Sequence, residues 1–282
     1  MWKTLTAASI LLIASTATAR TIYVDNQIGV DVNDGTSPTI TGLQSGPVRT
    51  LRRAQVLVRP GDVIEIANTG VPYYDSLRLV GSQASGVPSQ PTVVNGNGAI
   101  FDGSDPVTAE QWQPLGKGLW RLDPLQKGWY QLVRDDVPVP ETPAAYEGGR
   151  PSPPPGHWSA WRGSLYYQAL PDELPANELF RIATREAGVF LYGVRYIVVR
   201  NLTVRHFRLD GVNVHDQADY VVLENIVSEN NGRSGIFVGG SSRVRILGGA
   251  TQSNREASLL LKEKGTVDLH EMQLDAEPVV AE

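Results

Sequence analysis

The sequence predicts an all-β fold, a parallel β-helix in which short strands wind into stacked coils. Residues 195–274 repeat at a period of 24, and each repeat alternates β-branched residues with Asn and Gly turns. The chain also has no cysteine, so disulfides cannot stabilise it, and a repeating ladder with one continuous core can. We therefore expect a single solenoid domain over residues 20–282.

The repeat becomes visible when segments 24 residues apart are aligned. Residues 199–204 match residues 223–228, and residues 210–214 match residues 234–238. A third, degraded copy follows another 24 residues on, and a fourth ends at residue 274. This pattern predicts coils of three short strands each, stacked at the usual strand spacing of about 4.8 Å.

The period also predicts which side chains stack on one another. Asn201 and Asn225 are expected to form an inward amide ladder, and Asn230 and Asn254 to form a second one headed by His206. Charged residues 24 apart often have opposite sign, which favours pairing between coils. Such pairing is a structural explanation for most of the charges in the repeat.

A helix is expected ahead of the strands. Leu51, Ala54 and Val58 have helical spacing within residues 50–58, and Pro60-Gly61 ends the segment. Because the first coil of a solenoid would otherwise expose an open apolar end, we expect this helix to cap it.

The N-terminus predicts export. Residues 1–19 have a positive start, a short apolar stretch and small residues at 17–19, which is typical of a secretory signal peptide. No other segment is long and apolar enough to span a membrane, so we expect an extracellular or periplasmic protein. The formal net charge of −5 argues against nucleic acid as a partner.

Residues 104–175 interrupt the strand pattern. They contain five of the six tryptophans, the pair Tyr166-Tyr167 and a proline run at 151–155. We interpret this segment as an irregular aromatic and proline-rich insertion that packs on the side of the solenoid through its large aromatic residues.

The first hundred residues resemble a known family. Tyr23-Val24-Asp25, then residues 34–38, 46–51 and 60–64, and finally the stretch 81–103 follow one another in the order seen in secreted right-handed parallel β-helix proteins of the pectate-lyase-like kind. The resemblance implies a right-handed helix, a polysaccharide partner and, as an enzyme, a lyase or hydrolase acting on acidic uronate polymers. We expect a monomer.

The resemblance also implies residues for calcium. In pectate lyases an acidic residue precedes one strand and another lies one coil on, which makes Asp210 and Glu224 candidate ligands for calcium. The match is partial, because Val222-Leu223-Glu224-Asn225 replaces the Trp-Ile-Asp-His tetrad of the family.

The densest polar cluster lies in the same coils. Arg205, His206, Arg208 and His215 supply cations and possible bases, and we treat them as the candidate catalytic residues. Arg233 lies one coil on and is a candidate substrate contact. A cation and a base within two coils suit β-elimination, while the structural alternative is that these residues belong to the stacking ladders.

Three functions remain open at this stage. The first is an enzyme acting on an acidic polysaccharide. The second is a non-catalytic carbohydrate-binding or surface protein that uses the aromatic insertion, with Trp158, Trp161 and Tyr167 as sugar-stacking side chains. The third is a truncated, inactive member of the family, since relatives generally continue through more coils.

Overall fold

The structure is a computed structural model that describes residues 19–143 and 150–281. The predicted signal peptide therefore lies, except for Ala19, outside the described residues, as does part of the predicted insertion. Among the described residues, no helix has the length and apolar character needed to cross a membrane.

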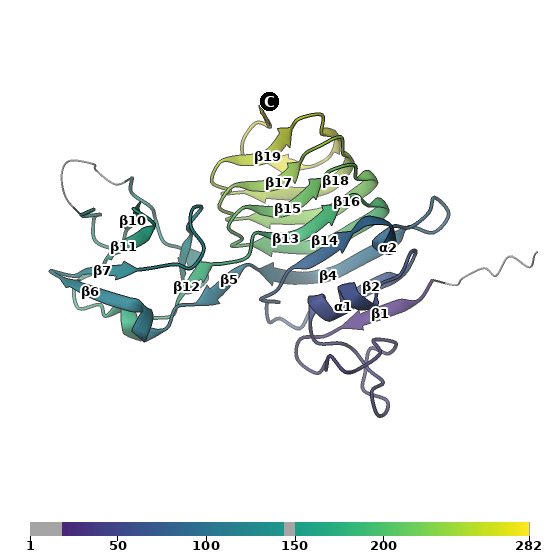
Figure 1. The fold of residues 1–282 in the computed structure, drawn as a ribbon, viewed down its shortest axis with the longest axis horizontal. Helices are drawn as coiled ribbons and strands as arrows, with labels where there is room; N and C mark the ends of the chain where they lie inside the picture. The colour runs from purple at the N-terminus through teal and green to yellow at the C-terminus, as the bar shows by residue number, and fades with distance from the viewer. Residues whose placement is uncertain (1–18, 144–149, 282) are drawn as a thin grey trace, which may run out of the picture.

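Two parallel sheets run the length of the solenoid (Figure 1). The long-strand sheet has the order β1-β2-β4-β14-β16-β18-β20, with β21 also paired to β18. Its strands are β1 (Thr21–Val24), β2 (Val63–Ile66), β4 (Thr92–Asp102), β14 (Arg195–Arg205), β16 (Asp219–Glu229), β18 (Arg243–Gln252), β20 (Thr266–His270) and β21 (Gln273–Leu274).

The short-strand sheet has the order β22-β19-β17-β15-β13-β3 and is also parallel throughout. Its strands are β3 (Leu77–Val80), β13 (Ala187–Tyr192), β15 (Asp210–His215), β17 (Ser234–Val238), β19 (Ala257–Lys262) and β22 (Val279–Ala281). Because the chain alternates between the two sheets while it climbs one strand spacing per turn, the parallel β-helix expected from the repeat is confirmed.

Each long strand of the repeat is bent in the middle. Asn201 in β14 and Asn225 in β16 both have φ of 55°, and the pairing between the strands passes over them. Asn tolerates this left-handed conformation better than most residues do. The bend divides one long strand into two straight segments, so a coil has the three segments that the repeat predicts.

The expected register holds for the first step and fails by one residue for the next. Arg195 pairs with Asp219 and Asp210 pairs with Ser234, which is 24 residues in each case. On the following coil Ser234 pairs with Ala257, a step of 23. The coil has lost one residue in its turns, which is why the third copy of the repeat looks degraded.

The two predicted amide ladders are corrected accordingly. Asn225 does stack on Asn201, with a 3.2 Å hydrogen bond from Nδ2 to Oδ1, but Asn225 is exposed, so the ladder faces outward. The left-handed backbone turns both side chains away from the core. The inward ladder joins Asn231, not Asn230, to Asn254 at 2.9 Å, because the step there is 23 residues.

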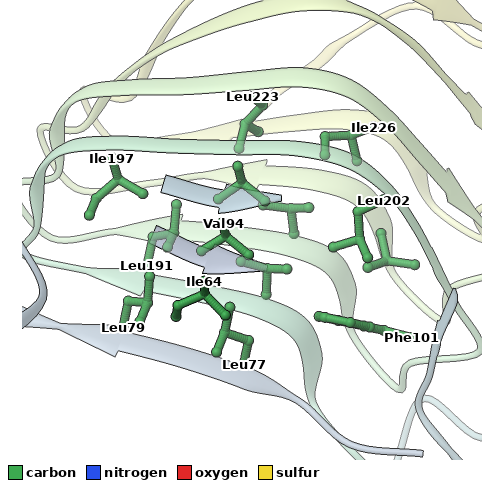
Figure 2. Close-up of a cluster of buried hydrophobic side chains, with 14 of the residues drawn as sticks. Ile64, Leu77, Leu79, Val94, Phe101, Leu191, Ile197, Leu202, Leu223 and Ile226 are labelled. Carbon is green, nitrogen blue, oxygen red and sulfur yellow. The ribbon is translucent and has the colours of Figure 1, made fainter. Parts of the chain in front are cut away.

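The core fills the space between the sheets with aliphatic side chains (Figure 2). Alternate residues of each strand point inward. In β14, Ile197 and Val199 are fully buried, whereas the side chains of Val198 and Arg200, which alternate with them, point outward and are half-buried.

The predicted cap is confirmed as α1 (Leu51–Leu57), which lies at the N-terminal end of the solenoid beside β1 and β2 (Figure 1). Thr50 caps it, its side-chain oxygen accepting a 3.0 Å hydrogen bond from the Arg53 amide. Leu51 and Ala54 are fully buried in the solenoid core. A second helical turn, α2 (Gly81–Ala84), follows β3.

Residues 104–183 form a side module that projects from the solenoid (Figure 1). It has two antiparallel sheets of four strands, β10-β11-β7-β6 and β5-β12-β8-β9. Its elements are β5 (Ser104–Pro106), η1 (Ala109–Gln111), β6 (Trp112–Gly116), β7 (Leu119–Leu122), β8 (Leu132–Arg134), β9 (Val137–Pro138), β10 (Trp158–Trp161), β11 (Ser164–Gln168), η2 (Pro175–Asn177) and β12 (Phe180–Ala183).

The side module has a hydrophobic core of its own. Trp112, Tyr167 and Phe180 lie against one another with ring centroids 5.1–6.0 Å apart. The expectation that the aromatic residues of this segment pack on the solenoid is therefore wrong. They close the two small sheets on each other, which gives this segment regular structure.

Candidate functional site

A groove of about 560 Å³ lies on the outer face of the long-strand sheet. It crosses β14, β16, β18 and β20, where the outward residues of successive coils stand above one another. Its lining includes Pro91, Tyr196, Val198, Asp219, Tyr220, Val222, Arg243, Arg245, Thr266 and Asp268. A second hollow of about 390 Å³ adjoins it and shares Asp219 and Arg243.

Two tyrosines form one wall of the groove. Tyr196 and Tyr220 are 24 residues apart, and their rings stack with centroids 4.6 Å apart and planes at 10°. Both residues have a left-handed backbone, with φ of 54° and 55°. For an aromatic residue that conformation costs on the order of 1–3 kcal/mol, which is comparable with the free energy that ring stacking contributes. Tyr220 stays 57% exposed, so the wall is open to a ligand.

The charges in the groove are only partly neutralised. Arg195 lies 3.3 Å from Asp219, one coil on. Arg243 is exposed and forms no ion pair with residues 19–143 or 150–281. Its guanidinium is therefore available to a carboxylate or another anion, which guanidinium groups bind in bidentate fashion.

Two charged residues of the lining, Arg245 and Asp268, form a group with the imidazole of His270, which lies two residues further along β20. Asp268 accepts a hydrogen bond from Arg245 Nε at 2.9 Å, and His270 Nε2 lies 2.9 Å from its other oxygen. The hydrogen bond from His270, followed by that from Arg245, lowers the pKa of Asp268. Asp268 can therefore orient the imidazole of His270, which leaves Nδ1 free to exchange a proton.

Comparison with known proteins gives the handedness of the coils. Residues 181–273 match the family described as a right handed beta helix region. The chain carries a right-handed β-helix. The resemblance to pectate-lyase-like proteins is thus confirmed at the level of the fold. No curated protein matches the sequence significantly.

Solved structures share the β-helix at low identity. A complex of XylC with xylose has 12% identity and a TM-score of 0.58, over 89% of this chain and 58% of that one. A glycoside hydrolase has 13% identity and a TM-score of 0.57, over 87% of this chain and 68% of that one. The pectate lyase Pel9A has 14% identity and a TM-score of 0.47, over 93% and 56%. The chain thus spans little more than half the length of the XylC chain that it matches.

The predicted catalytic residues Arg205 and His206 lie where the side module leaves the β-helix. His206 is fully buried, with Nδ1 2.9 Å from Asp102, and Arg205 Nε donates to the same carboxylate at 3.0 Å. Arg205 also pairs with Asp136 of the side module at 3.0 Å. A buried imidazole of this kind does not contact a polysaccharide on the surface, so the arrangement joins two parts of the structure.

The buried Asp102 is kept ionised by its neighbours. Burial alone would raise its pKa, but the hydrogen bond and charge of His206, together with hydrogen bonds from Ser104, outweigh burial and lower the pKa to about 2. Hydrogen bonds to the charged form have this effect on carboxylates generally.

The predicted residues Arg208, Asp210 and Arg233 are also engaged in the structure. Asp210 is fully buried and accepts hydrogen bonds from Arg233 at 2.9 and 2.6 Å, from Ser234 at 2.7 Å and from Asn213 at 2.7 Å. Arg208 donates to backbone carbonyls of the side module. Burial on its own would lower the pKa of Arg233, but its contacts with Asp210 outweigh this and raise it.

His215 lies on the outer face of the other sheet. Its ring stacks between Tyr192, at 6.0 Å, and Phe237, at 5.8 Å. Being in the short-strand sheet, it does not line the groove. The four predicted catalytic residues are therefore not brought together on one surface.

The two predicted calcium ligands are separated as well. Asp210 is in β15 of the short-strand sheet and Glu224 in β16 of the long-strand sheet, with the core between them. The expectation that they share one ion is therefore wrong. The repeat did not reveal that the two residues belong to different sheets of the coil. Within the described residues, no group of three or more acidic, His or Cys side chains is placed to hold a metal.

The aromatic residues predicted to bind sugar are mostly unavailable. Trp158 and Tyr167 are 2% and 0% exposed in the core of the side module, so that part of the prediction is wrong. Trp161 is half-buried and lies under the guanidinium of Arg162 at 4.5 Å. The sequence did contain a signal for the tyrosine wall of the groove. Arg195-Tyr196 and Asp219-Tyr220 repeat an aromatic residue at the period of the coils.

Proposed function

We propose that this protein binds an acidic polysaccharide along the groove on the outer face of the long-strand sheet. The single observation that carries the proposal is the Tyr196–Tyr220 stack, in which Tyr220 is exposed, beside Arg243, whose guanidinium has no ion-pair partner among residues 19–143 and 150–281. Two of the similar solved structures, a complex of XylC with xylose and a glycoside hydrolase, support a carbohydrate ligand.

The groove offers what a sugar chain needs. The C–H groups of a sugar ring carry partial positive charge and pack against the negative face of an aromatic ring. Arg243 and Arg245 are donors for carboxylates, and Asp219 accepts hydrogen bonds from hydroxyls. Because the lining spans four strands of the sheet, several sugar units can bind in a row.

The proposal is tested with a panel of soluble glycans. Polygalacturonate, alginate and a neutral xylan are assayed for retardation of the protein in affinity gels, with Tyr220→Ala as the variant. Tyr192→Ala is the matched control, because Tyr192 is 40% exposed but lies on the other sheet. We expect retardation by the acidic polymers for the parent and the control, and little for Tyr220→Ala. Equal retardation of all three proteins would refute the groove as the site.

The Arg245–Asp268–His270 group supports a second candidate function, cleavage of the bound polymer by β-elimination. An arginine would neutralise the uronate carboxylate, and His270, oriented by Asp268, would take the proton α to it while the C4–O bond breaks. The leaving oxygen takes a proton from water. Cleavage creates an unsaturated uronate, so absorbance in the ultraviolet measures it directly.

The assay includes calcium and chelator arms, because a calcium-dependent reaction is the alternative implied by the family resemblance. His270→Ala is expected to abolish cleavage but retain binding in the affinity gel. If the parent shows no absorbance change on any uronate polymer, the protein is a binding protein without this activity.

Export is part of the proposal, since an extracellular polysaccharide is out of reach of a protein that stays in the cytoplasm. The expected mature N-terminus is Arg20. N-terminal sequencing of protein recovered from the medium or periplasm tests it, and a product that still begins at Met1 would contradict it.

A further inference from the structure

Trp129 occupies an unusual place at the seam between the side module and the β-helix. It lies in the loop between β7 and β8, and among the described residues it is the only tryptophan classed as exposed, at 42%. Its indole Nε1 donates a 3.0 Å hydrogen bond to Glu256 Oε1 of the β-helix. The ring is thus fixed in orientation while much of its surface remains in contact with water.

The backbone that carries Trp129 is held firmly against the β-helix. Arg208 donates hydrogen bonds to the carbonyl of Lys127 at 2.9 Å and to that of Gly128 at 3.3 Å. Gly232 lies directly beneath, where a Cβ atom would fall 2.2 Å from the Arg208 carbonyl oxygen and 3.2 Å from that of Trp129. The loop therefore rests on a rigid support, as a preorganised binding site requires.

The conformation of Trp129 is costly. Its φ is 45°, in the left-handed region that a bulky side chain rarely adopts. The cost is on the order of 1–3 kcal/mol, and one partly exposed hydrogen bond returns only about 0.5–1.5 kcal/mol. Burial of the remaining surface of the residue offsets part of this cost. Strained backbone conformations are common at binding sites, where they position a side chain for the ligand.

We propose that Trp129 is a second sugar-binding platform at the seam, separate from the groove. One sugar ring packs on the exposed indole surface, and its hydroxyls donate to the free carboxylate oxygen of Glu256. Arg255, 44% exposed at its side chain and paired with Glu141 at 2.8 Å, borders the platform as a hydrogen-bond donor. The inference rests on the proposed function in one respect, that the ligand is a polysaccharide.

The polar surroundings favour a sugar over an apolar ligand. Glu256, which accepts the indole hydrogen bond, is exposed, and so is its neighbour Arg255, so an apolar molecule on the indole would remove water from charged groups. A sugar ring offers an apolar face to the indole and hydroxyls to the charges, and it satisfies both.

Tryptophan fluorescence reads this site separately from the groove, whose wall consists of tyrosines. Addition of an acidic oligosaccharide is expected to change the emission of the parent. That change should be lost in Trp129→Phe and kept in Trp120→Phe, the matched control, because Trp120 packs against the core of the side module. Persistence of the full change in Trp129→Phe would overturn the proposal.

Affinity gives the second readout. Trp129→Ala is expected to weaken binding of a long polymer about three- to tenfold, with Trp129→Phe closer to the parent. If Trp129→Ala binds like the parent while Tyr220→Ala loses binding, the seam is refuted as a sugar-binding site and the groove is supported as one. If the fluorescence change depends on Trp129 while Tyr220→Ala binds normally, the sugar site at the seam is supported and the groove is refuted as a binding site. If the parent binds no glycan, both proposals fail.

Discussion

The carboxylate of Asp102 and the imidazole of His206 are hydrogen-bonded at 2.9 Å, and both side chains are completely buried. Asp102 is the last residue of β4, two residues before the side module begins, and it also accepts hydrogen bonds from Arg205 and from the Ser104 amide. This carboxylate fixes the point at which the chain leaves the β-helix.

Replacement of Asp102 by Asn should therefore destabilise the protein strongly. The change removes the buried counter-charge of Arg205 and the carboxylate partner of His206, and a loss of about 3–5 kcal/mol is typical when one partner of a buried ion pair is removed. The free energy of unfolding at pH 7, from urea titration, measures the loss. Asp172→Asn is the control, because Asp172 is exposed, and it should unfold like the parent. Equal midpoints for both variants would show that Asp102 does not anchor the module.

The stability contributed by Asp102 should also depend on pH. Its pKa in the folded protein, about 2, lies below the unfolded value of about 4, so this stability is complete above about pH 4. It declines as the pH falls from about 4 towards 2. The difference in unfolding free energy between the parent and Asp102→Asn should shrink over this window, and a constant difference would contradict the lowered pKa.

The two amide ladders should differ in their contribution to stability. Asn231 is fully buried and binds Asn254, Ser228 and the Phe207 amide, so Asn231→Ala should cost about 1–3 kcal/mol. Asn225 is exposed, and Asn225→Ala should cost less than about 1 kcal/mol. Urea unfolding of the two variants measures both values, and a larger loss for Asn225→Ala would contradict the outward orientation of its ladder.

The repeat in the sequence was sufficient to predict stacked parallel coils, although not their handedness. Residues that stack must have compatible side chains, so the pairs Arg195 with Asp219 and Asp210 with Ser234 could be read from a period of 24. The inward or outward direction of Asn201 could not be read. It depends on a left-handed backbone at the bend, and a period of 24 is compatible with either direction.

The cap helix should be essential for a soluble product. Leu51 is fully buried against the first coils, so Leu51→Asp would place an unpaired charge in the core and open the edge of the sheet. We expect aggregation, measured by light scattering of the purified protein. Val56→Asp is the control on the same helix, since Val56 is 67% exposed. A soluble Leu51→Asp with an unchanged melting temperature would show that α1 does not protect the core.

A side chain at position 232 should loosen the side module. In Gly232→Ala the new methyl group would meet the Arg208 carbonyl oxygen, so either the turn or the loop of Trp129 must move. We expect faster proteolysis of residues 124–131, measured by mass spectrometry of the first cleavage products. Gly42→Ala is the control, because nothing lies within 4 Å of its added Cβ. An unchanged cleavage rate in Gly232→Ala would show that the close contact at Gly232 does not hold the loop of Trp129 in place.

The candidate site was harder to predict than the fold. The cluster from Arg205 to Asp210 was predicted to be a site because its polar residues are close in sequence. The chain turns within that stretch, so its side chains point in different directions. The groove instead collects single residues from successive coils, such as Tyr196, Tyr220 and Arg243. They lie together only once the register is known, and the step of 23 residues between the later coils had to be seen in the structure.

The central claim, that the groove binds an acidic polysaccharide through Arg243, is tested most directly by calorimetric titration of the parent and Arg243→Ala with polygalacturonate oligomers. Arg59→Ala, an exposed arginine near the cap, is the control. We predict that Arg243→Ala loses about tenfold or more in affinity, as expected for a charge-assisted hydrogen bond, while Arg59→Ala binds like the parent. Equal affinities of all three proteins, or binding of a neutral xylan as tight as that of the acidic oligomer, would contradict the claim.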